Sequence, residues 1–140
     1  GIRDRKVMQD PMRWVEAVSA AGIDKLEKAG VPRDSYDFWL RPYGYNGVSG
    51  MPVPEGYVPN ELLMMLTVTA ETQEKATQIT KAFNPLLLHH NIFEGKQMPS
   101  YGFLFSPAEM ERGAIYEFML YHTVSVDDPL ELVRFHYDEI

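Results

Sequence analysis

The segment from Leu62 to Thr69 constrains the fold of this chain more than any other stretch of its sequence. Successive side chains of a β-strand point to opposite faces, so the segment presents two sets of four residues. One set is wholly apolar and the other is half apolar: Leu62, Met64, Leu66 and Val68, and Leu63, Met65, Thr67 and Thr69. Burial on most of both faces is typical of a central strand. We therefore expect this strand at an interior position in a sheet of four or more strands.

A helix is predicted near the start of the chain. Asp10 followed by Pro11 is a helix-start signal, because Asp caps free backbone N–H groups and Pro is tolerated at the first helical position. Apolar residues at helical spacing continue to Leu26. Gly22 lowers helix propensity in the middle, so the segment is either one helix or two short ones.

The remaining elements follow from changes in periodicity. A second helix is predicted over residues 71–83, and Asn84-Pro85 predicts a separate short helix over 86–89. Period-two alternation predicts strands over 36–45, 101–105 and 115–126, with a polar loop over 95–100.

This order is helix, strand, strand, helix, strand, strand, which predicts an α+β fold with an antiparallel or mixed sheet and helices on one face. It matches a ferredoxin-like plait lacking its first strand, with residues 1–140 forming a single domain. The chain begins Gly1-Ile2 without an initiator Met. We expect it to be the C-terminal domain or small subunit of a larger enzyme, whose preceding residues could supply the first strand.

Composition excludes several classes of function. Thirteen basic against 20 acidic residues give a net charge of −7, and the basic residues are scattered. Nucleic acids and anionic membranes both require a basic surface, so we expect neither as a partner. There is no cysteine, which excludes thiol catalysis and thiolate metal sites. No apolar run reaches the length of a membrane span. A cytoplasmic protein is the expectation.

Six segments together carry a family resemblance: GIRD at 1–4, RPYGYNGVSG at 41–50, LTVTAETQEKA at 66–76, LLLHH at 86–90, FLFSPAEMERGAIYEF at 103–118 and YHTVSVDDPLEL at 121–132. In this order they resemble the C-terminal part of the acyclic terpene utilisation protein A family, a domain of unknown function. Members of that family are associated with bacterial catabolism of acyclic terpenes such as citronellol and geraniol.

The resemblance implies part of an acid- or acyl-metabolising enzyme of the hydratase or lyase type, inactive by itself. The expected partners are a larger N-terminal portion or partner subunit and a small carboxylate or acyl substrate, in an oligomer. No cofactor is assigned, and no metal signature is present. The alternative is a non-catalytic assembly module that mediates oligomerisation by sheet pairing, because an incomplete sheet exposes an edge.

Two residues are candidate catalytic groups. His89 is followed by His90 near a predicted helix end, where imidazole can act as a general base. The alternative role is structural, since a cation at a helix C-terminus is stabilised by the helix dipole. Of the two, His89 matches the pattern of the family. Glu117 is the second candidate, because a carboxylate among apolar residues needs a partner or a cleft.

Arg41 and Tyr43 are candidate substrate-binding residues on the predicted strand over 36–45. Arg41 would either hold a substrate carboxylate or form an ion pair with Glu117 from a neighbouring strand. His122 would face away from Glu117 on a regular strand. Ser106 before a proline lacks a nucleophile motif and is interpreted as a helix cap, with Glu109 completing a capping box.

Overall fold

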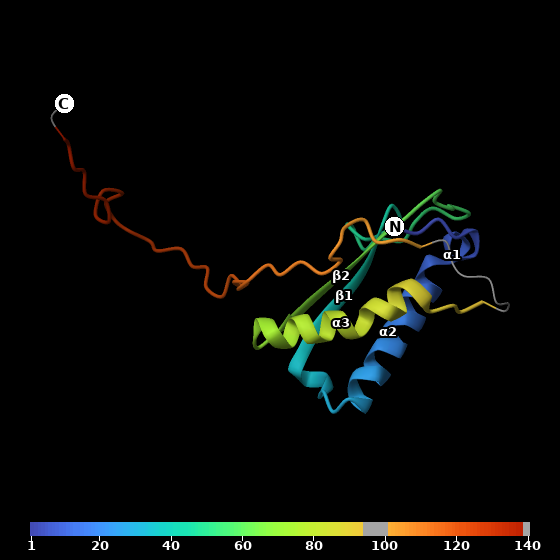
Figure 1. Cartoon of the computed structure of the whole chain (residues 1–140). Helices are drawn as coiled ribbons and strands as arrows, with labels where there is room; N and C mark the ends of the chain where they lie inside the picture. Colours follow the sequence, from blue (N-terminus) through green and yellow to red (C-terminus); the bar gives the residue numbers. More distant parts are fainter. Residues whose placement is uncertain (94–100, 139–140) are drawn as a thin grey trace.

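The computed structural model describes residues 1–93 and 101–138, which form an α+β body followed by a long extended arm (Figure 1). The elements in chain order are α1 (Arg5–Gln9), α2 (Pro11–Lys28), the 3-10 turn η1 (Arg33–Ser35), β1 (Tyr36–Tyr43), β2 (Leu63–Ala70) and α3 (Gln73–His89). The predicted order of the first helix, two strands and second helix is confirmed. The loop predicted over 95–100 lies outside the described residues.

The two strands form an antiparallel sheet. Leu40 lies opposite Leu66, and Arg41 lies opposite Met65. Both helices cover the same face of this sheet, with α2 over β1 and α3 over β2 (Figure 1). The α+β class with helices on one face is therefore confirmed.

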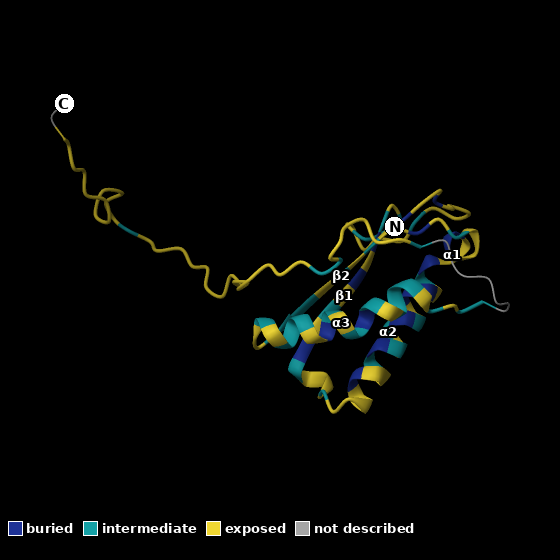
Figure 2. Cartoon of the chain, viewed as in Figure 1, coloured by how far each residue is buried: buried dark blue, intermediate teal, exposed yellow. Residues whose placement is uncertain are grey.

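The core lies between the sheet and the helices. It contains apolar residues from every layer, as the dark-blue positions in Figure 2 show: Ile2, Val7, Met8, Trp14, Val15, Val18, Leu26, Tyr36, Leu40, Leu62, Ile79 and Phe83. The predicted alternation along β1 is confirmed, because Tyr36 and Leu40 are buried while Trp39 and Arg41 are exposed.

The first long helix begins where the sequence predicts. The Asp10 carboxylate accepts the backbone N–H of Arg13 at 3.1 Å, and Pro11 occupies the first position. Gly22 does not divide the segment, since α2 is continuous from Pro11 to Lys28. Gly22 is instead a contact point, because the buried ring of Phe83 lies against its backbone.

The second helix is longer than expected. Pro85 lies inside α3, which continues to His89, so the predicted break into two helices is wrong. Thr72 caps the start of α3, where its hydroxyl accepts the backbone N–H of Lys75 at 3.2 Å. Helix α2 contacts α3 close to Pro85, because the Lys25 ammonium donates a hydrogen bond to the carbonyl of Ala82 at 2.8 Å.

The expected central strand is an edge strand. Among the described residues the sheet has two strands rather than four or more, and β2 pairs only with β1 along its length. Its far edge carries a single bridge, from Ile2 to Leu62. Leu63 and Met65 point to the side of the sheet away from the helices and are 40% and 41% exposed. Within a single chain the expected interior position is wrong, because composition reports what a strand can bury and not whether the same chain supplies its neighbour.

The two predicted C-terminal strands are also not formed. In the first, only Tyr101 makes a bridge, to Ile2. In the second, residues 115–126 are extended without a paired neighbour. Residues with high strand propensity form a strand by packing against neighbouring strands, and no described strand lies beside this segment.

Candidate functional site

Two candidate substrate-binding residues lie together on the uncovered side of the sheet. Arg41 and Tyr43 point away from the helices, on the same face of β1 as Trp39, which is 44% exposed. Their cross-strand neighbours on β2 are Met65 and Leu63. We call this surface the open face; it consists of Asp37, Trp39, Arg41, Tyr43, Leu63, Met65, Thr67 and Thr69.

The candidate catalytic residues lie elsewhere. His89 is the last residue of α3 and is exposed, while His90 follows as the C-terminal cap. Glu117 lies in the extended segment beyond the body and is exposed. The structure therefore does not bring His89, Glu117 and Arg41 together within one chain.

The expected pairing of Arg41 with Glu117 on neighbouring strands is not formed. Within the described part of the chain, the ion pairs are Lys28–Asp24 and Lys75–Glu71, each between residues four apart in the sequence. Glu117 belongs to no strand, so it has no face of the sheet to share with Arg41.

Residues 109–113 take a different role from the predicted helix cap. No helix follows Ser106, so the capping box is wrong. Glu109 instead accepts a hydrogen bond from the Asn84 side chain, and Glu111 accepts one from the Thr77 hydroxyl at 3.0 Å. The backbone N–H of Gly113 donates to the Gln73 side chain at 3.2 Å. We call residues 109–113 the strap, because it is held along α3 by these bonds.

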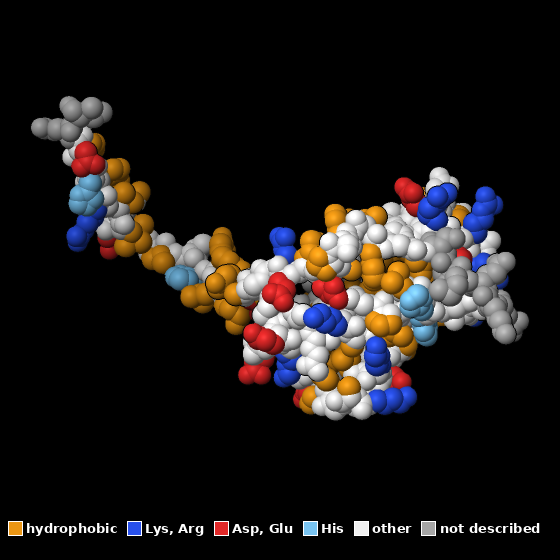
Figure 3. All heavy atoms as spheres, in the orientation of Figure 1, with side chains coloured by type: hydrophobic (Ala, Val, Ile, Leu, Met, Phe, Trp, Pro, Cys, Tyr) orange, Lys and Arg blue, Asp and Glu red, His pale blue; other side chains and the backbone are white. Residues whose placement is uncertain are grey.

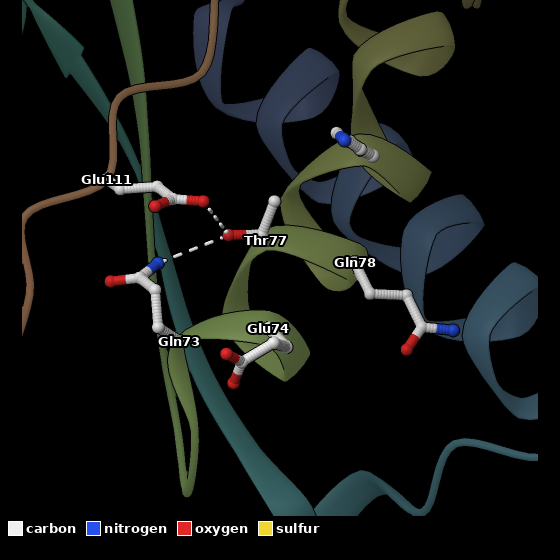
Figure 4. A pocket seen from close by; sticks show the side chains of 6 residues that line it. Gln73, Glu74, Thr77, Gln78 and Glu111 are labelled. Atoms are coloured by element: carbon white, nitrogen blue, oxygen red, sulfur yellow. Dashed lines mark hydrogen bonds between the residues drawn. The ribbon is translucent and has the colours of Figure 1, made fainter.

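An open groove of about 440 Å³ lies where the strap meets α3. Figure 4 shows Gln73 and Glu111 both reaching the Thr77 hydroxyl, with Gln73 donating to it at 3.2 Å. Glu74, Gln78 and Lys81 complete the lining from α3. Gln73, Thr77 and Glu111 are occupied in holding the strap, and the lining contains no nucleophile beside a base.

One partly buried tyrosine has a strongly shifted pKa. Burial raises the pKa of the Tyr101 hydroxyl above its ordinary value, and the negative charge of Asp4 raises it further. The Tyr101 ring packs edge-on against Trp14, with ring centroids 5.5 Å apart. This environment keeps Tyr101 neutral and points to a structural role at the end of the sheet.

The described part of the chain offers neither a cluster of metal ligands nor a candidate membrane-spanning helix. Residues 1–93 and 101–138 contain no cluster of three or more His, Asp or Glu side chains placed to hold a metal ion. Within the same ranges, no helix combines the length and the apolar character that crossing a bilayer requires.

The most unusual surface was not identified from the sequence as a site. We call residues 114–138 the arm, which extends away from the body beyond the strap (Figures 1 and 3). Hydrophobic side chains lie exposed along it: Ile115, Tyr116, Phe118, Met119, Leu120, Tyr121, Val124, Leu130, Leu132, Val133, Phe135 and Tyr137. The alternation of apolar and polar residues over 115–126 is the sequence signal for this surface. It predicts a strand, but it does not indicate that the strand lacks a neighbour within its own chain.

No family model matches this chain, and neither curated proteins nor solved structures match it. The resemblance to the acyclic terpene utilisation protein A family therefore rests on the six sequence segments themselves.

Proposed function

We propose that this chain is an assembly module without activity as a single chain, whose open face and arm join copies of the chain into an oligomer. The observation that carries the proposal is the partial exposure of Trp39, Leu63 and Met65 on the side of the sheet that no helix covers. Contiguous apolar surface of this kind marks interaction sites in proteins. The arm adds a second apolar surface in the same chain.

The distribution of the candidate catalytic groups favours assembly over catalysis by one chain. A general base must lie within hydrogen-bonding reach of the proton it removes. His89 ends the helix on the covered side of the sheet, Arg41 lies on the open face, and Glu117 lies on the arm. Only association could bring groups from these three places toward one substrate.

We further propose that the assembled enzyme is a hydratase or lyase acting on acids or acyl thioesters. The sequence resemblance supports this narrower proposal. Arg41 and Tyr43 would then bind a substrate carboxylate at the interface, because guanidinium recognises carboxylate geometry. A ferredoxin-like plait is the proposed complete fold: Ile2 lies beside Leu62 where a plait has its first strand, and Tyr101 lies beyond Ile2 where it has its last.

Replacing one residue of the open face tests the assembly proposal. Lysine on an edge strand is a common means of preventing sheet association, so Met65→Lys should weaken self-association measured by sedimentation velocity. Gln78→Lys is the matched control, because it adds the same charge at an exposed position on the helical side. Equal association of both variants and the unmodified chain would refute an interface at the open face.

A further inference from the structure

The β2 edge of the sheet has no neighbouring strand along its length, although the apolar residues of β2 indicate that one belongs there. Of the side chains of β1 that face the helices, Tyr36 and Leu40 are 3% and 8% exposed, and Phe38 is partly buried. All three corresponding side chains of β2, Met64, Leu66 and Val68, are only partly buried. These side chains of both strands point toward the same helical layer, so the difference in burial lies in what flanks each strand. The incomplete burial is concentrated on β2.

The sequences of the two strands indicate which strand ends the sheet and which one has a further neighbouring strand. β1 carries Asp37, Arg41 and Pro42, and charges and prolines are typical of strands that end a sheet. β2 reads Leu-Met-Met-Leu-Thr-Val-Thr-Ala and carries neither a charge nor a proline. A strand of this composition normally has neighbours on both sides. The missing strand therefore belongs beside β2, in line with Ile2.

The arm contains a segment with the pattern that such a strand needs. From residue 116 to 126, every second side chain is apolar except one: Tyr116, Phe118, Leu120, His122, Val124 and Val126. Alternation of this kind gives a strand one face for the core. Phe118 and Leu120 are nevertheless 83% and 74% exposed, and every residue from 110 to 125 is exposed. The segment is also long enough to cover the eight residues of β2.

The course of the chain directs this segment away from its own sheet. Three hydrogen bonds hold the strap on α3, ending with the Gly113 N–H on Gln73. Gly113 has φ of +72°, a conformation that favours glycine, and the arm leaves the body beyond it (Figure 1). The arm is thus fixed at its base and extends away from its own sheet (Figure 1).

We propose that residues 115–126 of one copy add as a strand to the free edge of β2 in a second copy, in a reciprocal exchange. This inference rests on the proposed assembly function and names its partner. A second copy fits because one chain carries both the incomplete edge and the matching strand. Two-fold exchange satisfies both edges at once and closes the assembly as a dimer. Each exchanged strand buries the face that carries Phe118 and Leu120.

A pair of charge substitutions on opposite faces of the arm tests the exchange. Leu120→Asp places a carboxylate on the face that would enter the core, whereas Met119→Asp places the same charge on the other face. The body should fold in both variants, because the arm contributes nothing to the core of its own chain. By sedimentation velocity, Leu120→Asp should weaken dimerisation at least tenfold, while Met119→Asp should leave it within about threefold of the unmodified chain.

Amide hydrogen exchange on the full chain supplies the second measurement. In the dimer, amides of 115–126 and of β2 should be protected together, and Leu120→Asp should abolish the protection of both. A dimer that persists with Leu120→Asp would overturn the exchange while leaving the assembly function intact. A monomer with a protected arm would show the arm folded on its own sheet and would overturn both proposals.

Discussion

The ring of Phe83 in α3 packs directly against the backbone of Gly22 in α2. A Cβ at position 22 would lie 2.1 Å from Cε1 of Phe83, well inside van der Waals contact. Phe83 is fully buried, so its ring can move away only by displacing other residues of the core. The close approach of the two helices over the sheet therefore depends on the absence of a side chain at residue 22.

Gly22→Ala should destabilise the protein even though alanine is the better helix former. The gain in helix propensity is about 1 kcal/mol, and the overpacking in a filled core costs more. We expect a net loss of about 1–2 kcal/mol in the free energy of unfolding, measured by urea denaturation. Combining it with Phe83→Leu should cost less than the sum of the two single changes, because the smaller side chain relieves the clash. An unchanged or raised stability of Gly22→Ala would contradict the contact.

Tyr101→Phe should reduce the loss of stability at alkaline pH. The folded state raises the pKa of Tyr101 above the value of about 10 found in unfolded chains. The folded state therefore holds the proton more tightly, so stability is full below pH 10 and falls as the pH rises above it. Urea unfolding at pH values from about 8 to 11 should show a shallower decline for Tyr101→Phe.

The control for this pH profile is Tyr137→Phe, since Tyr137 lies on the arm beyond the exchanged segment and is 88% exposed. Its profile should overlay that of the unmodified chain. Identical profiles for Tyr101→Phe and the unmodified chain would show that the Tyr101 hydroxyl ionises as freely in the folded protein as in the unfolded one.

Arg41→Met should have little effect on stability. Arg41 is exposed on the open face and has no ion-pair partner among the described residues. Exposed substitutions of this kind usually change the free energy of unfolding by less than about 0.5 kcal/mol. Urea denaturation at one fixed protein concentration measures the difference. A loss of roughly 3 kcal/mol or more would instead indicate a buried pair, formed with Glu117 upon assembly.

Features set by neighbouring residues were predictable from the sequence. Asp10 and Pro11 mark the start of α2 because capping involves only the first helical turn. The two faces of β1 follow from alternation, which requires only that one side of the strand meets a core.

Features set by distant residues were not predictable. The interior position expected for Leu62–Thr69 and the strand expected over 115–126 both depend on a neighbouring strand, which propensity does not supply. The role of Gly22 depends on Phe83, which lies in another helix. Arg41, His89 and Glu117 are candidates because of the chemistry of their side chains. Side-chain chemistry does not determine whether the fold brings the three residues into one site.

The mass of the unmodified full chain in solution tests the central claim most directly. The open face and the arm together leave apolar surface exposed that a single chain does not cover. Sedimentation equilibrium over a dilution series should give a species of twice the 16.1 kDa chain mass, dissociating only at low concentration. A stable monomer of 16.1 kDa at every concentration would contradict the account of this chain as an assembly module.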